Sequence, residues 1–220
     1  MEFKQPAIDL QNIHCLLIDL DDTLYPRSKA VSPLIRERII DYMTHQMDFS
    51  EDEVPVIHRR LFREYGTTLR GLQKEYTVDM DTFLSYVFDI PIESVLAPDP
   101  DLDRLLHSLP QRKVIFTNSP AFHAERVLEV LNVADHFDTI LDVYATFPYC
   151  KPDPEAFQIA LDLIDENPEN CLMFEDSPDN LKTAQTLGIA TVSIGKYPHD
   201  GSPHFETFHE IESLFSPDRS

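Results

Sequence analysis

Three carboxylates lie within four residues at the end of a short apolar run. The run Cys15–Ile18 is typical of a strand buried on both faces, and Asp19, Asp21 and Asp22 follow it directly. Burying carboxylates is costly unless a partner neutralises them. Mg²⁺, a hard cation that prefers oxygen ligands, is a natural partner. Taken alone, the stretch is equally compatible with a strand that runs out into an acidic surface turn.

Two further apolar runs also end in polar side chains. Val114–Phe116 and Cys171–Phe174 read as buried strands of the same kind. The polar residues that follow these two strands are Thr117 and Asn118, and Glu175 and Asp176. A lysine, Lys151, comes from a proline-containing loop. Because the carboxyl ends of parallel strands meet at one edge of a sheet, we expect these groups to converge.

Together these side chains are suited to phosphoryl transfer through a covalent intermediate. A carboxylate such as Asp19 can attack phosphorus and form an acyl phosphate. A second carboxylate two residues on, Asp21, can protonate the leaving oxygen and then activate water. Mg²⁺ would neutralise charges that otherwise repel a phosphate, and Lys151 with a hydroxyl would donate to the phosphoryl oxygens.

These residues resemble the four motifs of the haloacid dehalogenase-like hydrolase superfamily, in the family's order. The matching segments are Asp19–Thr23, Thr117–Asn118, Lys151–Pro152 and Glu175–Ser177. The resemblance implies that Asp19 is the nucleophile and Asp21 the general acid and base. It implies that Mg²⁺ is bound by Asp19, the Asp21 carbonyl and Asp176, with Glu175 in the same shell. It also implies that Thr117, Asn118 and Lys151 bind phosphate.

Asp21 also indicates a branch of the family. A halide leaves without a proton, so a dehalogenase needs no acid at this position, whereas a phosphatase or phosphomutase does. The stretches Tyr65–Leu72 and Leu109–Asn118 resemble the pyrimidine 5′-nucleotidase group, which suggests a nucleoside 5′-monophosphate as substrate. Arg70 would then help to recognise the substrate, or it is a solvated helix arginine.

Two alternatives to a nucleotidase stay open. The Glu175-Asp176 pair is also seen in sugar-phosphate phosphatases and phosphomutases, so a sugar-phosphate or phosphoglycolate phosphatase, or a β-phosphoglucomutase-like enzyme, is the second reading. A binding module of the same family without catalysis is a third. It would be expected to lack catalytic residues, and all are present in this sequence.

The apolar patterning predicts an α/β fold with a doubly wound parallel sheet. Strand and helix patterns alternate from about Asp99 onward, whereas residues 27–97 show only amphipathic helices. We therefore expect a core made of residues 1–26 and 98–220, and an inserted helical bundle, residues 27–97, which resembles the family's cap of the first type. A cap joined beside the acidic turn would act as a lid.

Local signals predict some details of the helices and the tail. Ser32-Pro33 indicates a helix start, and Ser50–Glu53 resembles a capping box. In the tail, His199, His204 and His209 fit no common zinc spacing, and we expect a solvated segment with a short helix near its end.

Composition limits the partners. A net charge of −21 and a pI near 4.6 argue against nucleic acid and anionic membranes as partners. The expected partner, a small phosphate ester, must be drawn in against this charge by a metal and a few basic side chains. Three scattered cysteines suit a reducing cytoplasm. The first ten residues lack the apolar segment of a signal peptide, and no apolar run reaches the length of a membrane span. The sequence carries no signal for an oligomeric state.

Overall fold

The computed structural model of the chain describes residue 8 and residues 10–215. Its contacts divide the chain into two compact units. The core unit ends at Lys29 and resumes at Leu96, and the helical unit is Ala30–Val95. None of the helices in the described part of the chain is both long and apolar enough to cross a bilayer.

The core unit is built on one six-stranded sheet in which every neighbouring pair is parallel, in the order β3-β2-β1-β4-β5-β6. The strands are β1 (Cys15–Ile18), β2 (Arg112–Phe116), β3 (Thr139–Leu141), β4 (Cys171–Glu175), β5 (Ala190–Ile194) and β6 (His204–Phe205). This sheet confirms the predicted α/β class. Because β1 lies between β2 and β4, the three strands with polar ends are neighbours.

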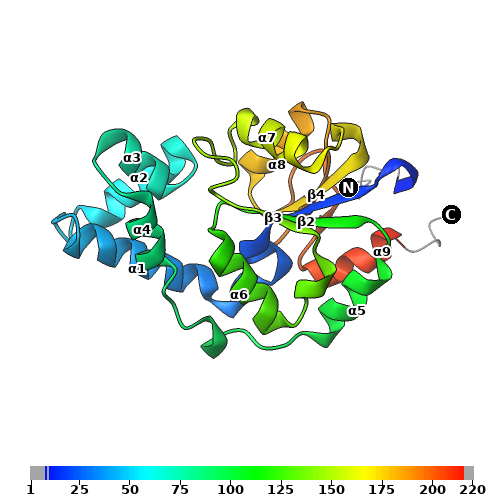
Figure 1. Cartoon of the computed structure of the whole chain (residues 1–220), viewed down its shortest axis with the longest axis horizontal. Helices are drawn as coiled ribbons and strands as arrows, with labels where there is room; N and C mark the ends of the chain where they lie inside the picture. The colour runs from blue at the N-terminus through cyan, green and yellow to red at the C-terminus, as the bar shows by residue number, and fades with distance from the viewer. Residues whose placement is uncertain (1–7, 9, 216–220) are drawn as a thin grey trace. The chain divides into compact units, whose positions relative to one another are not determined.

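Helices cover both faces of the sheet (Figure 1). They are α5 (Pro100–Ser108), α6 (Ala121–Leu131), α7 (Pro154–Ile164), α8 (Pro178–Thr186) and α9 (Glu212–Phe215). Figure 1 shows α7 and α8 on one side and α5, α6 and α9 on the other. On the α7 side, Leu17 and Met173 belong to a buried cluster in which Phe116 meets Phe157 edge to face at 5.2 Å between ring centroids. Short helical turns connect these elements: η1 (Leu10–Asn12), η2 (Leu20–Leu24), η3 (Arg27–Lys29), η5 (Ala134–His136), η6 (Pro168–Asn170) and η7 (Phe208–Ile211).

The register of the central strands determines where the polar residues emerge. Ile18 at the end of β1 pairs with Ile115 of β2 and with Phe174 of β4. The next residues along these strands, Asp19 and Glu175, therefore leave the sheet at the same level. The Asp19 amide still donates to the Phe174 carbonyl at 3.0 Å, which fixes the backbone of Asp19 to β4.

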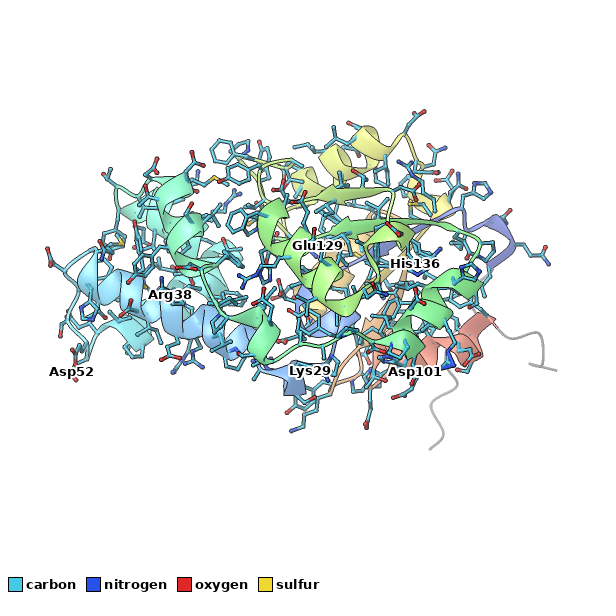
Figure 2. All side chains as sticks on the ribbon, turned by 60° about the horizontal axis from the view of Figure 1, so that its bottom comes forward. Lys29, Arg38, Asp52, Asp101, Glu129 and His136 are labelled. Atoms are coloured by element: carbon cyan, nitrogen blue, oxygen red, sulfur yellow. The ribbon has the colours of Figure 1, made fainter. Side chains whose placement is uncertain are left out.

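The helical unit consists of α1 (Val31–His45), α2 (Val54–Tyr65), α3 (Thr68–Glu75), α4 (Met80–Val87) and the turn η4 (Ile92–Ser94). Tyr42 packs edge to face on Phe83 at 5.0 Å between centroids, in the buried interior of the unit. Arg38 on α1 (labelled in Figure 2) donates to the Tyr86 carbonyl at 2.8 Å and lies 4.0 Å from the Tyr86 ring centroid. These contacts join α1 to α4.

Two helix starts differ from the prediction. Helix α1 begins at Val31, after Ala30 in a left-handed conformation (φ 64°), so Ser32 is not its cap. Pro33 is tolerated because the amides of a first turn have no partner within the helix. Helix α2 begins at Val54 without a side-chain cap, so the predicted capping box is wrong. There the Ser50 backbone carbonyl accepts the Val54 amide at 3.1 Å instead.

The tail is more ordered than the sequence predicted. His204 belongs to β6, which pairs with β5, and the imidazole of His209 lies 3.1 Å from the Asp99 carboxylate. Phe208 is buried and meets Phe174 edge to face at 5.1 Å between centroids. A two-residue strand is too short to show periodicity, so β6 could not be predicted from the apolar pattern.

Candidate active site

A buried lysine lies at the centre of the polar edge of the sheet. The Lys151 Nζ is 2.8 Å from Asp19 Oδ1 and 2.8 Å from Glu175 Oε2, and it donates to the Phe116 carbonyl at 2.6 Å. The three donors of an ammonium group are thereby all used. The Lys151 side chain is 1% exposed, so these two carboxylates are what stabilises its charge. The structure brings together three of the predicted site residues here.

The second oxygen of Glu175 accepts from the chain that follows β4. Its Oε1 accepts the Asp176 amide at 3.2 Å and the Ser177 amide at 3.1 Å. These bonds turn the backbone sharply before α8 begins at Pro178. Glu175 is therefore held at both oxygens, which fixes the position at which it meets Lys151.

Three carboxylates form a group with the spacing of a metal site. One oxygen each from Asp19, Glu175 and Asp176 lies within 4.8 Å of the others. Burial and the neighbouring charge of Glu175 raise the pKa of Asp19 to about 7, although Lys151 opposes the shift. Burial, Glu175 and Asp19 raise the pKa of Asp176 to about 9. Both shifts have the sign expected where negative charge exceeds positive charge, which is the situation that a divalent cation relieves.

The motif after β2 supports Lys151 through its backbone. The Asn118 side-chain amide donates to the Lys151 carbonyl at 2.9 Å, and its oxygen accepts the Lys151 amide at 2.9 Å. Thr117 is buried, and its hydroxyl oxygen accepts the Ser119 amide at 3.0 Å. The structure therefore shows Asn118 aligning the Lys151 segment, and its predicted contact with phosphate remains a prediction.

Asp21 lies in the turn η2 and accepts hydrogen bonds from three side chains. Its Oδ2 accepts from the Ser119 hydroxyl at 2.6 Å, and its Oδ1 lies 2.9 Å from His123 Nε2. The Tyr25 hydroxyl also donates to Oδ1. Burial alone would raise the pKa of Asp21, but the His123 imidazole and the bonds from Ser119 and Tyr25 outweigh burial and lower it. Asp21 and Asp19 thus have pKa values shifted in opposite directions.

Sequence reasoning did not identify Tyr25, Ser119 or His123 as partners of Asp21. One signal was available for His123: it is a polar residue in the first turn of α6, next to the apolar stripe of that helix, and it is 2% exposed. Arg70, by contrast, lies on α3 in the helical unit. Its predicted role in substrate recognition remains a prediction.

Comparison with known proteins identifies the family. Residues 13–188 match the family model described as haloacid dehalogenase-like hydrolase. The chain therefore belongs to the haloacid dehalogenase-like hydrolases, and the predicted superfamily is confirmed. Enzymes of this family generally use Mg²⁺.

Named relatives include phosphatases. The chain is 30% identical to Phosphate metabolism protein 8 of Saccharomyces cerevisiae over 215 residues, which cover 90% of this chain and 67% of that protein. It is 26% identical to Phosphoglycolate phosphatase of Colwellia psychrerythraea, over 92% of this chain and 96% of that one. It is also 30% identical to Beta-phosphoglucomutase of Bacillus subtilis, over 47% of each.

A solved structure of the same fold comes from Bacillus subtilis. The HAD-hydrolase YfnB, which was crystallised with magnesium, superposes with a TM-score of 0.62 at 18% identity, over 93% of this chain and 99% of that chain. At this identity the likeness shows the fold alone. For this chain, the cation site rests on its own carboxylates.

Replacing Lys151 tests whether the lysine neutralises the buried carboxylates. Lys151→Met should lower the free energy of unfolding by about 3 to 5 kcal/mol, because it leaves Asp19 and Glu175 buried without their partner. Adding Glu175→Gln to Lys151→Met should recover part of the loss, since one uncompensated charge is removed. Denaturant unfolding in EDTA measures both, with Lys182→Met on α8 as the control. A double variant no more stable than the single one would contradict this account.

The raised pKa values predict how stability depends on pH without metal. An unfolded aspartate titrates near 3.8, so between that pH and about 9 the folded protein holds more protons at Asp19 and Asp176 than the unfolded chain does. Stability must then fall as pH rises through this window. In EDTA, the free energy of unfolding should fall more steeply between pH 5 and pH 9 for the wild type than for Asp176→Asn. Added Mg²⁺ should raise the free energy of unfolding of the wild type most at high pH.

The exposed-carboxylate variant Asp101→Asn, at the start of α5, is the control for this measurement. It should follow the wild-type curve in EDTA and in Mg²⁺. Parallel curves for the wild type and Asp176→Asn would show that Asp176 carries no excess of negative charge.

Proposed function

We propose that the chain is a Mg²⁺-dependent phosphomonoester hydrolase that acts through an aspartyl-phosphate intermediate on a small phosphorylated metabolite. The observation that carries the proposal is the convergence at Asp19. Lys151 lies 2.8 Å from Asp19 Oδ1, and Glu175 and Asp176 bring their oxygens within 4.8 Å. A second carboxylate, Asp21, follows two residues later. It accepts hydrogen bonds from a different set of donors, Tyr25, Ser119 and His123.

In the first step, a carboxylate oxygen of Asp19 attacks phosphorus. The bond from that oxygen to phosphorus forms while the bond from phosphorus to the leaving oxygen breaks. Lys151 holds Asp19 Oδ1 at 2.8 Å, so the other oxygen, Oδ2, is better placed to attack. Asp21 gives a proton to the leaving oxygen, which departs as an alcohol.

In the second step, Asp21 takes a proton from water. The water oxygen attacks phosphorus and the Asp19–phosphate bond breaks, releasing inorganic phosphate and restoring the Asp19 carboxylate. The proton that Asp21 gave up in the first step is thereby regained. Thr117 and Lys151 are the proposed donors to the phosphoryl oxygens. Lys151 would exchange one of its three present acceptors for a phosphoryl oxygen, and Asn118 supports the Lys151 backbone.

The residues that would hold Mg²⁺ are Asp19, Asp176 and the backbone carbonyl of Asp21, with Glu175 beside them. The carboxylates fit a hard cation in type and spacing, and burial together with the charge of Glu175 raises the pKa of Asp19 and of Asp176, as expected where a cation would relieve the negative charge. When bound, Mg²⁺ supplies charge neutralisation for the carboxylates and polarisation of the phosphoryl group.

Asp21 also favours a phosphatase over a dehalogenase. L-2-haloacid dehalogenases share the fold, at TM-scores of 0.52 and 0.53 for the enzyme from Xanthobacter autotrophicus. A halide leaves without a proton, so that chemistry gives no reason for a carboxylate held by three donors two residues after the nucleophile. The phosphatase names among the relatives agree with this choice.

For the substrate, we propose a nucleoside 5′-monophosphate, with Arg70 contributing to its recognition. The support is the resemblance of Tyr65–Leu72 and Leu109–Asn118 to the pyrimidine 5′-nucleotidase group. The second candidate is a sugar-phosphate or phosphoglycolate phosphatase, or a phosphomutase. It is favoured by Glu175-Asp176 and by relatives named Phosphoglycolate phosphatase and Beta-phosphoglucomutase. A cytoplasmic location is proposed as well, because Cys15, Cys150 and Cys171 are all free thiols.

Removing the proposed nucleophile tests the reaction class. Asp19→Asn should lower kcat on p-nitrophenyl phosphate with Mg²⁺ by at least about a thousandfold, because an amide does not form the acyl phosphate. Asp101→Asn should leave the rate unchanged. Rapid acid quench of the wild type should trap about one phosphate per chain, and Asp19→Asn should trap none. Wild-type activity in Asp19→Asn would eliminate the enzyme proposed here.

A panel of phosphate esters tests the proposed substrate class and the proposed role of Arg70. The measurement is relative kcat/KM for nucleoside 5′-monophosphates, sugar phosphates and phosphoglycolate, with phosphate release separating hydrolysis from a mutase that retains its phosphate. Arg70→Ala should lower kcat/KM for the preferred ester about tenfold or more, and that for p-nitrophenyl phosphate far less. Arg59→Ala on α2 is the control. An unchanged profile would remove Arg70 from the recognition of substrate.

A further inference from the structure

The hydrogen bonds around Asp21 distinguish its two oxygens. A carboxylate offers about four lone-pair positions, two on each oxygen. Oδ1 faces two donors, the Tyr25 hydroxyl and His123 Nε2, so both of its positions are taken. Oδ2 faces one donor, the Ser119 hydroxyl at 2.6 Å, so one position on Oδ2 remains for a further partner. The four positions are thus filled unequally.

Burial differs between the Asp21 carboxylate and its donors. Tyr25 and His123 are each 2% exposed and Ser119 is 7% exposed, so all three donors approach from the interior of the core unit. The Asp21 side chain itself is 19% exposed. The carboxylate is thus more exposed than its donors, and Oδ2 has a position to spare for a substrate atom that arrives there.

The three donors come from two separate parts of the chain. Tyr25 closes the turn that carries Asp21, and it lies four residues on. Ser119 precedes α6 and His123 lies in its first turn. The start of α6 is itself held, because Asp142 accepts the Ala121 amide at 2.8 Å. A rigid helix start therefore presents two of the donors, which fixes the plane of the carboxylate as well as its position.

We infer that Oδ2 of Asp21 is the atom that transfers the proton in both steps, and that Tyr25, Ser119 and His123 are positioning residues that hold it there. This inference rests on the proposed phosphatase reaction. In the first step the proton on Oδ2 moves to the leaving oxygen as its bond to phosphorus breaks. In the second step the same Oδ2 takes a proton from the attacking water, so atoms and charge balance over the cycle.

The inference predicts a selective defect rather than a general one. kcat/KM reports the steps up to release of the leaving group. An alkoxide is strongly basic and needs a proton to leave, whereas nitrophenolate is weakly basic and leaves almost as well without one. Tyr25→Phe and His123→Leu should therefore lower kcat/KM on alkyl phosphates about tenfold to a hundredfold, with the loss on p-nitrophenyl phosphate below about threefold. His123→Gln, which can place an amide donor near the position of Nε2, should recover part of the loss.

Matched controls exist elsewhere in the chain. The Tyr86 hydroxyl donates to Asp41, and His136 Nε2 lies 2.7 Å from Asp103 Oδ1, so Tyr86→Phe and His136→Leu remove the same kinds of bond outside the site. Both should keep the wild-type dependence on the leaving group. Equal losses on alkyl and aryl esters in Tyr25→Phe, or no loss on either, would overturn the inference.

A structural measurement covers the case in which a variant fails to fold. Crystals of the wild type with Mg²⁺ and aluminium fluoride mimic the phosphoryl group in transfer, with an apical water. Asp21 Oδ2 is expected within hydrogen-bond distance of that water, with Oδ1 still bonded to Tyr25 and His123. Oδ1 in contact with the water would overturn the inference. Failure of the proposed function is distinguishable, because it would appear as an active Asp19→Asn variant.

Discussion

The site depends on one buried positive charge. Lys151 uses its three donors on Asp19, Glu175 and the Phe116 carbonyl, in a position that water barely reaches. A buried ammonium is stable only with such partners, and buried carboxylates only with such a cation. Burial lowers the pKa of Lys151, but the two carboxylates outweigh burial and raise it. The ammonium therefore stays charged, and it fixes Asp19 relative to both neighbouring strands.

The parallel sheet is what brings these charges together. Pairing of Ile18 with Phe174 brings Asp19 and Glu175 out of the sheet at one level, and the Asn118 amide ties the Lys151 backbone to the end of β2. A shift of one residue in the β1–β4 register would reverse the face of every side chain. The apolar cores on both faces oppose such a shift. Packing energy far from the site thus maintains its geometry.

Sequence patterns predicted the strands, the polar residues at their ends and the family, because buried strands and clustered carboxylates are local signals. They did not predict the donors around Asp21. Ser119 and His123 reach Asp21 across 98 and 102 positions, and no spacing rule connects them. Asn118 shows a second limit: its residue type fits phosphate binding, whereas its contacts in the structure are to the Lys151 backbone. The strand β6 escaped prediction because two residues carry no periodicity.

The surroundings of Asp19 and Asp21 shift the pKa values of the two carboxylates in opposite directions. Asp19 lies near Glu175 and Asp176, and burial together with the charge of Glu175 raises its pKa, which favours a cation. Asp21, two residues away, lies among donors that lower its pKa. Where one carboxylate attacks and the other gives a proton, the attacking group is ionised and the other carries the proton. Without a cation the order at Asp19 and Asp21 is the reverse, so a cation bound beside Asp19 would have to lower its pKa before Asp19 could attack.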